Sequence, residues 1–70
     1  MKYIIIQTEF NLPAAIMFAE HLEHKTVANG HKVLSAGFCN SLGETWGHSE
    51  SLGIDSKASD SDYIKMALNC

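Results

Sequence analysis

The chain has 70 residues, 46% of them hydrophobic, and a formal net charge of −3 at pH 7 with histidine neutral. Its five basic residues are lysines scattered along the chain. Binding to DNA or RNA needs clustered basic side chains to neutralise phosphates, so we expect no nucleic-acid partner. The length predicts a single domain over residues 1–70.

The small size of the chain predicts self-association. A domain of this length removes only about 60% of the unfolded surface, and disulfides, a metal or a partner subunit usually supplement such a core. The two cysteines, Cys39 and Cys70, do not make a disulfide framework. The apolar run at residues 3–6 is too short for a signal peptide or a membrane span. We therefore expect a cytoplasmic homo-oligomer with no membrane contact.

The first half of the chain predicts a strand followed by an ambiguous segment. Residues 2–7 hold a β-branched and aromatic run, typical of a buried strand. Helix propensity alone predicts one helix over residues 13–29. The alternative is a short strand at residues 14–18 and then a helix over residues 20–29. Both interpretations end at Asn29-Gly30, a helix-stop signal.

The middle of the chain predicts a second long strand and a return strand. Residues 31–39 alternate in type, with Gly37 inside the strand, where a glycine indicates a bulge or a close backbone approach. Residues 44–49 favour a return strand, with Thr45 and Trp46 as its best strand formers. The Gly- and Ser-rich residues 47–56 predict a structured loop.

The C-terminal segment predicts a helix. Ser59 stands at the N-cap position and Asp62 at the third helical position, a variant of the capping box. An apolar stripe follows at Tyr63, Ile64, Ala67 and Leu68.

These elements together predict an α+β fold: a small, mainly antiparallel sheet of three to four strands with two helices. One helix follows the first pair of strands and the other ends the chain. The face of the sheet opposite the helices, or one edge of the sheet, would then be the surface for assembly.

Catalytic and metal-binding groups receive little support. His21 and His24 are neighbours on a helix, but no third ligand stands at a recognisable spacing, so a solvated helical face is favoured over a metal site. Cys39 fits a small buried side chain better than a nucleophile. We therefore expect no catalytic residue, no metal and no cofactor.

The glycine–serine segment is the best candidate for a ligand-binding loop. Gly47, Ser49, Ser51 and Gly53 alternate, so in an extended segment they would face one side, with Glu50 pointing away. Such a loop can cradle phosphate or ribose oxygens. The alternative is a turn whose serines bond their own backbone, and spacing alone favours that alternative.

Several segments together resemble a family of short, mostly uncharacterised proteins of tailed phages and prophages. The specific segments are Ser-Ala-Gly-Phe at residues 35–38 and Gly-His-Ser-Glu-Ser-Leu-Gly at residues 47–53. Weaker ones are residues 15–18, His24 with residues 27–28, and Asp62 before Ile64. Relatives carry a β-branched Pro-Ile-Val-Phe-like segment in place of residues 15–18, which favours the strand there.

The resemblance implies no settled activity, but its phage context suggests a function. Phages make small homo-oligomeric proteins that sequester nucleotide-derived immune signals, of cyclic or ADP-ribose type, to block host defence. By that analogy we expect a small nucleotide-like ligand. Its polar contacts would be His24, Ser49, Ser51 and Lys57, its stacking surface Phe18 or Phe38, and its close backbone approaches Gly37 and Gly47.

Two other functions stay open at this point. A protein–protein interaction module that inhibits a host defence enzyme would use a flat apolar patch. A small phosphodiesterase-like enzyme would rely on His24 or His48, although the sequence offers no acid–base pair to support it.

Overall fold

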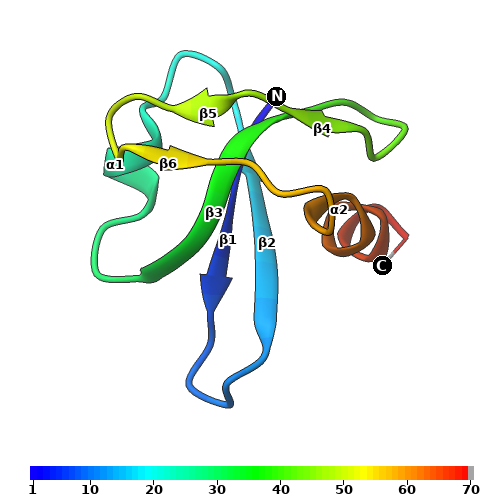
Figure 1. Cartoon of the computed structure of the whole chain (residues 1–70), viewed down its shortest axis with the longest axis horizontal. Coiled ribbons are helices and arrows are strands. Elements are labelled where there is room, and N and C mark those ends of the chain that lie inside the picture. The colour runs from blue at the N-terminus through cyan, green and yellow to red at the C-terminus, as the bar shows by residue number, and fades with distance from the viewer. Residues whose placement is uncertain (70) are drawn as a thin grey trace.

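The computed structural model describes residues 1–69 and shows an α+β fold (Figure 1). The main antiparallel sheet has the strand order β2-β1-β3-β4, and a small second sheet pairs β5 with β6. The strands are β1 (Lys2–Gln7), β2 (Pro13–Phe18), β3 (Lys32–Cys39), β4 (Thr45–Trp46), β5 (His48–Ser49) and β6 (Ile54–Asp55). The helices are α1 (His24–Val27) and α2 (Asp60–Leu68). Within residues 1–69 neither helix has the length and apolar character needed to cross a membrane.

Strand β1 is the centre of the sheet, as its sequence predicts. Its four central residues, Tyr3 to Ile6, are buried, and β1 pairs with both β2 and β3. Ile4 lies opposite Ile16 of β2 and opposite Ala36 of β3. The register with β3 shifts after Ile5, so Leu34 is an extra residue in β3. Such a bulge increases the local twist of the sheet.

The two faces of the sheet support two separate hydrophobic clusters. Tyr3 and Ile5 pack with Cys39 and with Ile64 of α2 on one face. Ile4 and Ile6 pack with Ala28 and Ala36 on the other face, with Leu52 and Ile54 beside them. This division follows from the alternation of side chains along a strand.

Of the two assembly surfaces predicted, the uncovered sheet face is wrong, whereas the sheet edge stays a prediction. Figure 1 shows α1 and α2 on opposite sides of the molecule. Helix α2 packs on one face of the sheet, and residues around α1 pack on the other. Residues 48–55 also pack over the face of the sheet on which α1 lies. Neither face of the sheet is therefore left open for assembly.

The single helix predicted over residues 13–29 is also wrong, and the alternative strand at residues 14–18 is confirmed as β2. Six residue pairs with β1 give this segment backbone partners and bury its apolar side chains, which overrides local helix propensity. The helix predicted over residues 20–29 shrinks to the single turn of α1, because residues 20–22 form a turn.

Gly37 is confirmed as a site of close backbone approach. A Cβ atom at this position would lie 2.5 Å from the carbonyl oxygen of Trp46 and 3.1 Å from Cβ of Ser56. The bulge lies elsewhere, at Leu34. Glycine therefore lets the segment from β4 to β6 pass directly over the end of β3.

Helix α2 begins where it was predicted, but the predicted capping box does not form. Ser59 flanks the helix in a helical backbone conformation and its side chain makes no capping hydrogen bond. The buried Asp60 carboxylate instead accepts bonds from the Lys57 backbone N–H at 2.9 Å, the Tyr3 hydroxyl at 2.5 Å and the Ser35 hydroxyl at 2.7 Å. These bonds join the start of α2 to the sheet.

Candidate ligand-binding pocket

A hollow of about 520 Å³ lies between the start of β1, the start of α1, the end of β3 and the β5–β6 turn. This volume falls in the range of small-molecule sites, roughly 300–1,000 Å³. The lining residues are Lys2, Glu23, His24, Phe38, His48, Glu50 and Ser51. They come from parts of the chain that only the folded sheet brings together.

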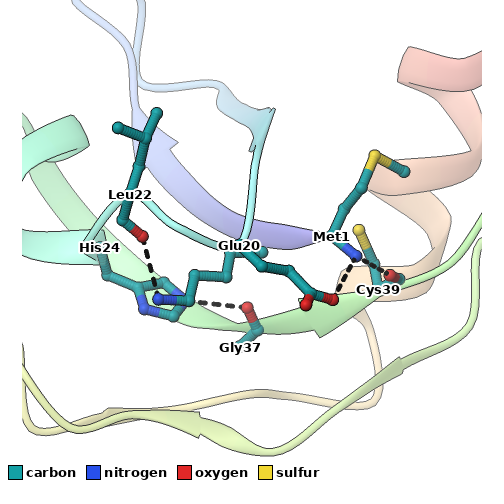
Figure 2. A network of polar contacts seen from close by, with 7 residues as sticks. Met1, Glu20, Leu22, His24, Gly37 and Cys39 are labelled. Carbon is teal, nitrogen blue, oxygen red and sulfur yellow. Dashed lines mark hydrogen bonds and ion pairs between the residues drawn. The ribbon is translucent and has the colours of Figure 1, made fainter.

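His24 is the most constrained side chain of the pocket. It is only 4% exposed, and its Nε2 atom lies 2.8 Å from the carbonyl oxygen of Gly37 (Figure 2). Because a carbonyl oxygen only accepts, Nε2 carries the hydrogen and donates it. The rings of Phe18 and Phe38 contact the imidazole edge-on, with centroid distances of 5.4 and 5.9 Å. The orientation and the tautomer of His24 are therefore set by the fold.

Lys2 lines the pocket, and contacts of Met1 and Lys2 hold the start of β1 in place. The Lys2 ammonium group donates to the Leu22 carbonyl oxygen at 2.9 Å. The Met1 amino group donates to the Cys39 carbonyl oxygen at 3.0 Å and lies 3.4 Å from Oε1 of Glu20 (Figure 2). These contacts hold the start of β1 against both the end of β3 and the turn before α1.

The serines of the β5–β6 turn are engaged with the protein backbone. Ser49 is fully buried, and its Oγ accepts from the Leu52 N–H at 3.2 Å. Oγ of Ser51 accepts from the Lys25 N–H at 3.2 Å and so joins the turn to α1. The alternative interpretation, a turn whose serines bond their own backbone, is confirmed for Ser49, whereas Ser51 bonds the backbone of α1.

The extended alternation expected of residues 47–53 is correspondingly wrong. The chain turns at residues 50–53, after the two residues of β5. Gly47 and Gly53 have positive φ angles of 78° and 66°, a conformation that glycine tolerates. As a result Glu50 lines the pocket instead of pointing away from it.

The structure places the sequence-predicted site residues in three groups. His24, Phe38 and Ser51 line the pocket. Phe18 and Gly37 contact His24 directly, and a Cβ atom at Gly47 would lie 3.0 Å from the Phe38 ring. Ser49 is buried beneath the turn, and the exposed Lys57 is not among the lining residues.

Four lining residues were not among the predicted contacts of a nucleotide-like ligand: Lys2, Glu23, His48, which was named only for the enzyme alternative, and Glu50, which was predicted to point away. A signal existed for Lys2, because it alternates with Ile4 and Ile6 and therefore lies on their face of the sheet. No comparable signal marks the two glutamates, since their position depends on how two turns meet.

The pocket carries charges of both signs. Lys2 is positive, whereas Glu23 and Glu50 are negative. Nε2 of His48 lies 3.8 Å from Oε1 of Glu50, and both side chains are largely exposed. With histidine neutral, the lining has one positive and two negative groups. This balance disfavours a ligand that is held mainly by its phosphates.

Two other reactive groups lie outside the pocket. Cys39 is buried, and burial raises the pKa of its thiol, which favours the unreactive protonated form. His21 is exposed while His24 is bonded to Gly37, so the two histidines do not face a common ligand position. Among residues 1–69 no three His, Cys, Asp or Glu side chains converge as a metal site would require.

Comparisons with models of protein families, with curated proteins and with solved structures found no match to this chain. The resemblance to short phage proteins is untested by them and stays a prediction.

Proposed function

We propose that this protein is a binding module that captures a small nucleotide-derived molecule in the pocket and holds it without converting it. The observation that carries the proposal is the pairing of an aromatic wall with a fixed polar group. Phe38 offers a ring, and His24 beside it is held in one orientation by Gly37. Small-molecule sites combine apolar surface with a few positioned polar groups in this way.

A nucleoside suits such a lining because it joins a flat ring to hydroxyl groups. The ring can stack on or lie against Phe38, and the hydroxyls can reach the carboxylates of Glu23 and Glu50 at the rim. In this proposal the protein acts in the cytoplasm, that of the host cell if the gene is carried by a phage. Its use there is to withhold a cyclic or ADP-ribose-type immune signal from host defence.

The test is capture followed by recovery of the ligand. The purified protein is incubated with a panel of nucleosides, cyclic nucleotides and ADP-ribose derivatives, separated from free ligand and denatured, and the released molecules are identified by mass spectrometry. Recovery of an unaltered molecule is the expected result. Recovery of an altered one would indicate an enzyme, and capture of none would contradict the proposal.

A matched pair of variants locates the binding. His48→Ala removes an exposed lining side chain and should weaken capture while leaving the melting temperature nearly unchanged. Lys57→Ala removes a charge that lies outside the lining and should leave capture intact. Equal effects of the two substitutions would show that the captured molecule binds elsewhere.

One observation favours a second candidate, a module that binds a host defence enzyme. Phe10 is 76% exposed and Leu12 is 64% exposed in the loop between β1 and β2. Exposed apolar side chains of this size are typical of protein contacts. The double substitution of Phe10→Ser and Leu12→Ser should abolish binding to such an enzyme, whereas His48→Ala should not.

A further inference from the structure

The acceptor side of His24 has no partner among residues 1–69. Nε2 donates to Gly37, so the remaining ring nitrogen, Nδ1, carries a lone pair when the ring is neutral. Among residues 1–69 no hydrogen bond reaches Nδ1, although every fully buried side-chain nitrogen and oxygen has a partner. Nδ1 therefore keeps some exposure, although His24 as a whole is only 4% exposed, and His24 lines the pocket.

The other lining groups add acceptors more than donors. Glu23 and Glu50 offer carboxylate oxygens, which only accept. Lys2 is the one strong cation of the lining, and it already donates one of its hydrogens to Leu22. A phosphate group would meet two like charges here and one opposite charge. A ligand group that donates hydrogen bonds would meet partners already in place.

Resting on the proposed function, we infer that the pocket selects its ligand through an amino group on a flat ring, with Nδ1 of His24 as the acceptor. Adenine-, cytosine- and guanine-type bases carry such a group. The rings of Phe18 and Phe38 contact the imidazole edge-on and fix its plane. The direction of the Nδ1 lone pair is therefore fixed as well. His24 is then the residue that determines specificity, and phosphates contribute little to affinity.

Three probes test the inference by calorimetry: adenosine, purine riboside and AMP. Purine riboside differs from adenosine only in having hydrogen in place of the amino group. A lost hydrogen bond that leaves a desolvated acceptor unpaired predicts about tenfold weaker binding of purine riboside. AMP should bind no more tightly than adenosine.

The variant His24→Gln separates recognition from structure. Its amide can still donate to the Gly37 carbonyl oxygen, but its acceptor oxygen is attached to Cδ and so does not replace Nδ1, which is attached to Cγ. It should bind adenosine and purine riboside equally, and a melting temperature near that of the natural protein would show that the fold is kept. Even if this variant fails to fold, the three probes on the natural protein decide the question.

The outcomes distinguish this inference from the proposed function. Equal affinity for adenosine and purine riboside, or AMP binding about tenfold tighter than adenosine, would overturn selection through an amino group and leave ligand capture standing. Failure of all three probes would overturn the inference, and failure of the wider capture panel would overturn the proposed function with it.

Discussion

At the scale of single residues, the pair of Tyr3 and Asp60 is the most consequential contact outside the pocket. Tyr3 is fully buried, and its hydroxyl donates to the Asp60 carboxylate at 2.5 Å. Burial of the phenol, and then its hydrogen bond to Asp60 and the negative charge of that group, raise the pKa of Tyr3 well above its ordinary value of 10.0. The neutral phenol is thus strongly favoured in the folded protein.

This pair predicts a loss of stability at high pH. The pKa of Tyr3 is raised on folding, so its contribution is complete below pH 10, and it declines above pH 10 as the unfolded chain releases the proton first. The free energy of unfolding should fall by about 1.4 kcal/mol for each pH unit above that value. Denaturant titrations between pH 9 and 11 measure this slope.

The control for the pH prediction is Tyr3→Phe. This variant is less stable at neutral pH because it lacks the bond to Asp60, but its stability should decline less steeply above pH 10. The two proteins differ only at this position, so the difference between the two slopes isolates Tyr3. If the stability of the two proteins declined equally steeply above pH 10, the attribution of this decline to Tyr3 would be contradicted.

Some of the residues that line the pocket could be predicted from the sequence, and others could not. His24 and Ser51 were predicted as ligand contacts, and both line the pocket. The bond from His24 to Gly37 could not be foreseen, because it joins positions 13 residues apart through the pairing of strands. Lys57 was also predicted as a polar contact of the ligand, but the chain leaves the pocket after β6 and takes Lys57 to the start of α2.

At the scale of elements, α2 shows how a correct helix can be predicted with the wrong cap. Ser59 precedes the helix as expected, yet the hydrogen bonds at this end belong to Asp60. A signal for this was present in the sequence. Asp60 lies four residues before Ile64 and so shares the face of the helix that turns toward the sheet.

The different roles of Asp60 and Ser59 at the start of α2 predict different losses of stability when each residue is replaced by alanine. Asp60→Ala leaves the hydroxyls of Tyr3 and Ser35 without their acceptor, and each unsatisfied buried group costs about 1–3 kcal/mol. The free energy of unfolding should therefore fall by at least about 2 kcal/mol. Ser59→Ala removes an exposed side chain without a capping bond, so its effect should stay within about 0.5 kcal/mol. Thermal or urea unfolding of both variants measures these losses. A larger loss of stability for Ser59→Ala than for Asp60→Ala would contradict the conclusion that Asp60 makes the bonds at the start of α2.

Strand β2 marks the limit of local prediction in the fold. Its residues favour a helix by propensity, and only the pairing with β1 makes them a strand. Strands β1 and β3, by contrast, carry β-branched and alternating residues and are found within one residue of their predicted bounds. The β5–β6 pair is too short for periodicity to reveal, since each strand has two residues.

At the scale of the whole molecule, both faces of the sheet are covered while several large apolar side chains stay exposed. Phe10 and Leu12 lie in the loop that leads into β2, and β2 is one of the two edge strands of the sheet. Leu42 is 72% exposed in a different loop, between β3 and β4. A chain of this size has little surplus stability to support such exposure alone.

We therefore predict that the protein self-associates through the β1–β2 loop and the neighbouring edge of β2. Light scattering at micromolar concentration should give a mass of at least twice the 7.7 kDa of one chain. The melting temperature should rise with protein concentration, because association stabilises only the folded chain. The double substitution of Phe10→Ser and Leu12→Ser should return the mass to that of one chain. The control, Leu42→Ser, should not change the mass. A monomeric natural protein would contradict self-association, and loss of association in the control would contradict the assignment of the interface to the β1–β2 loop.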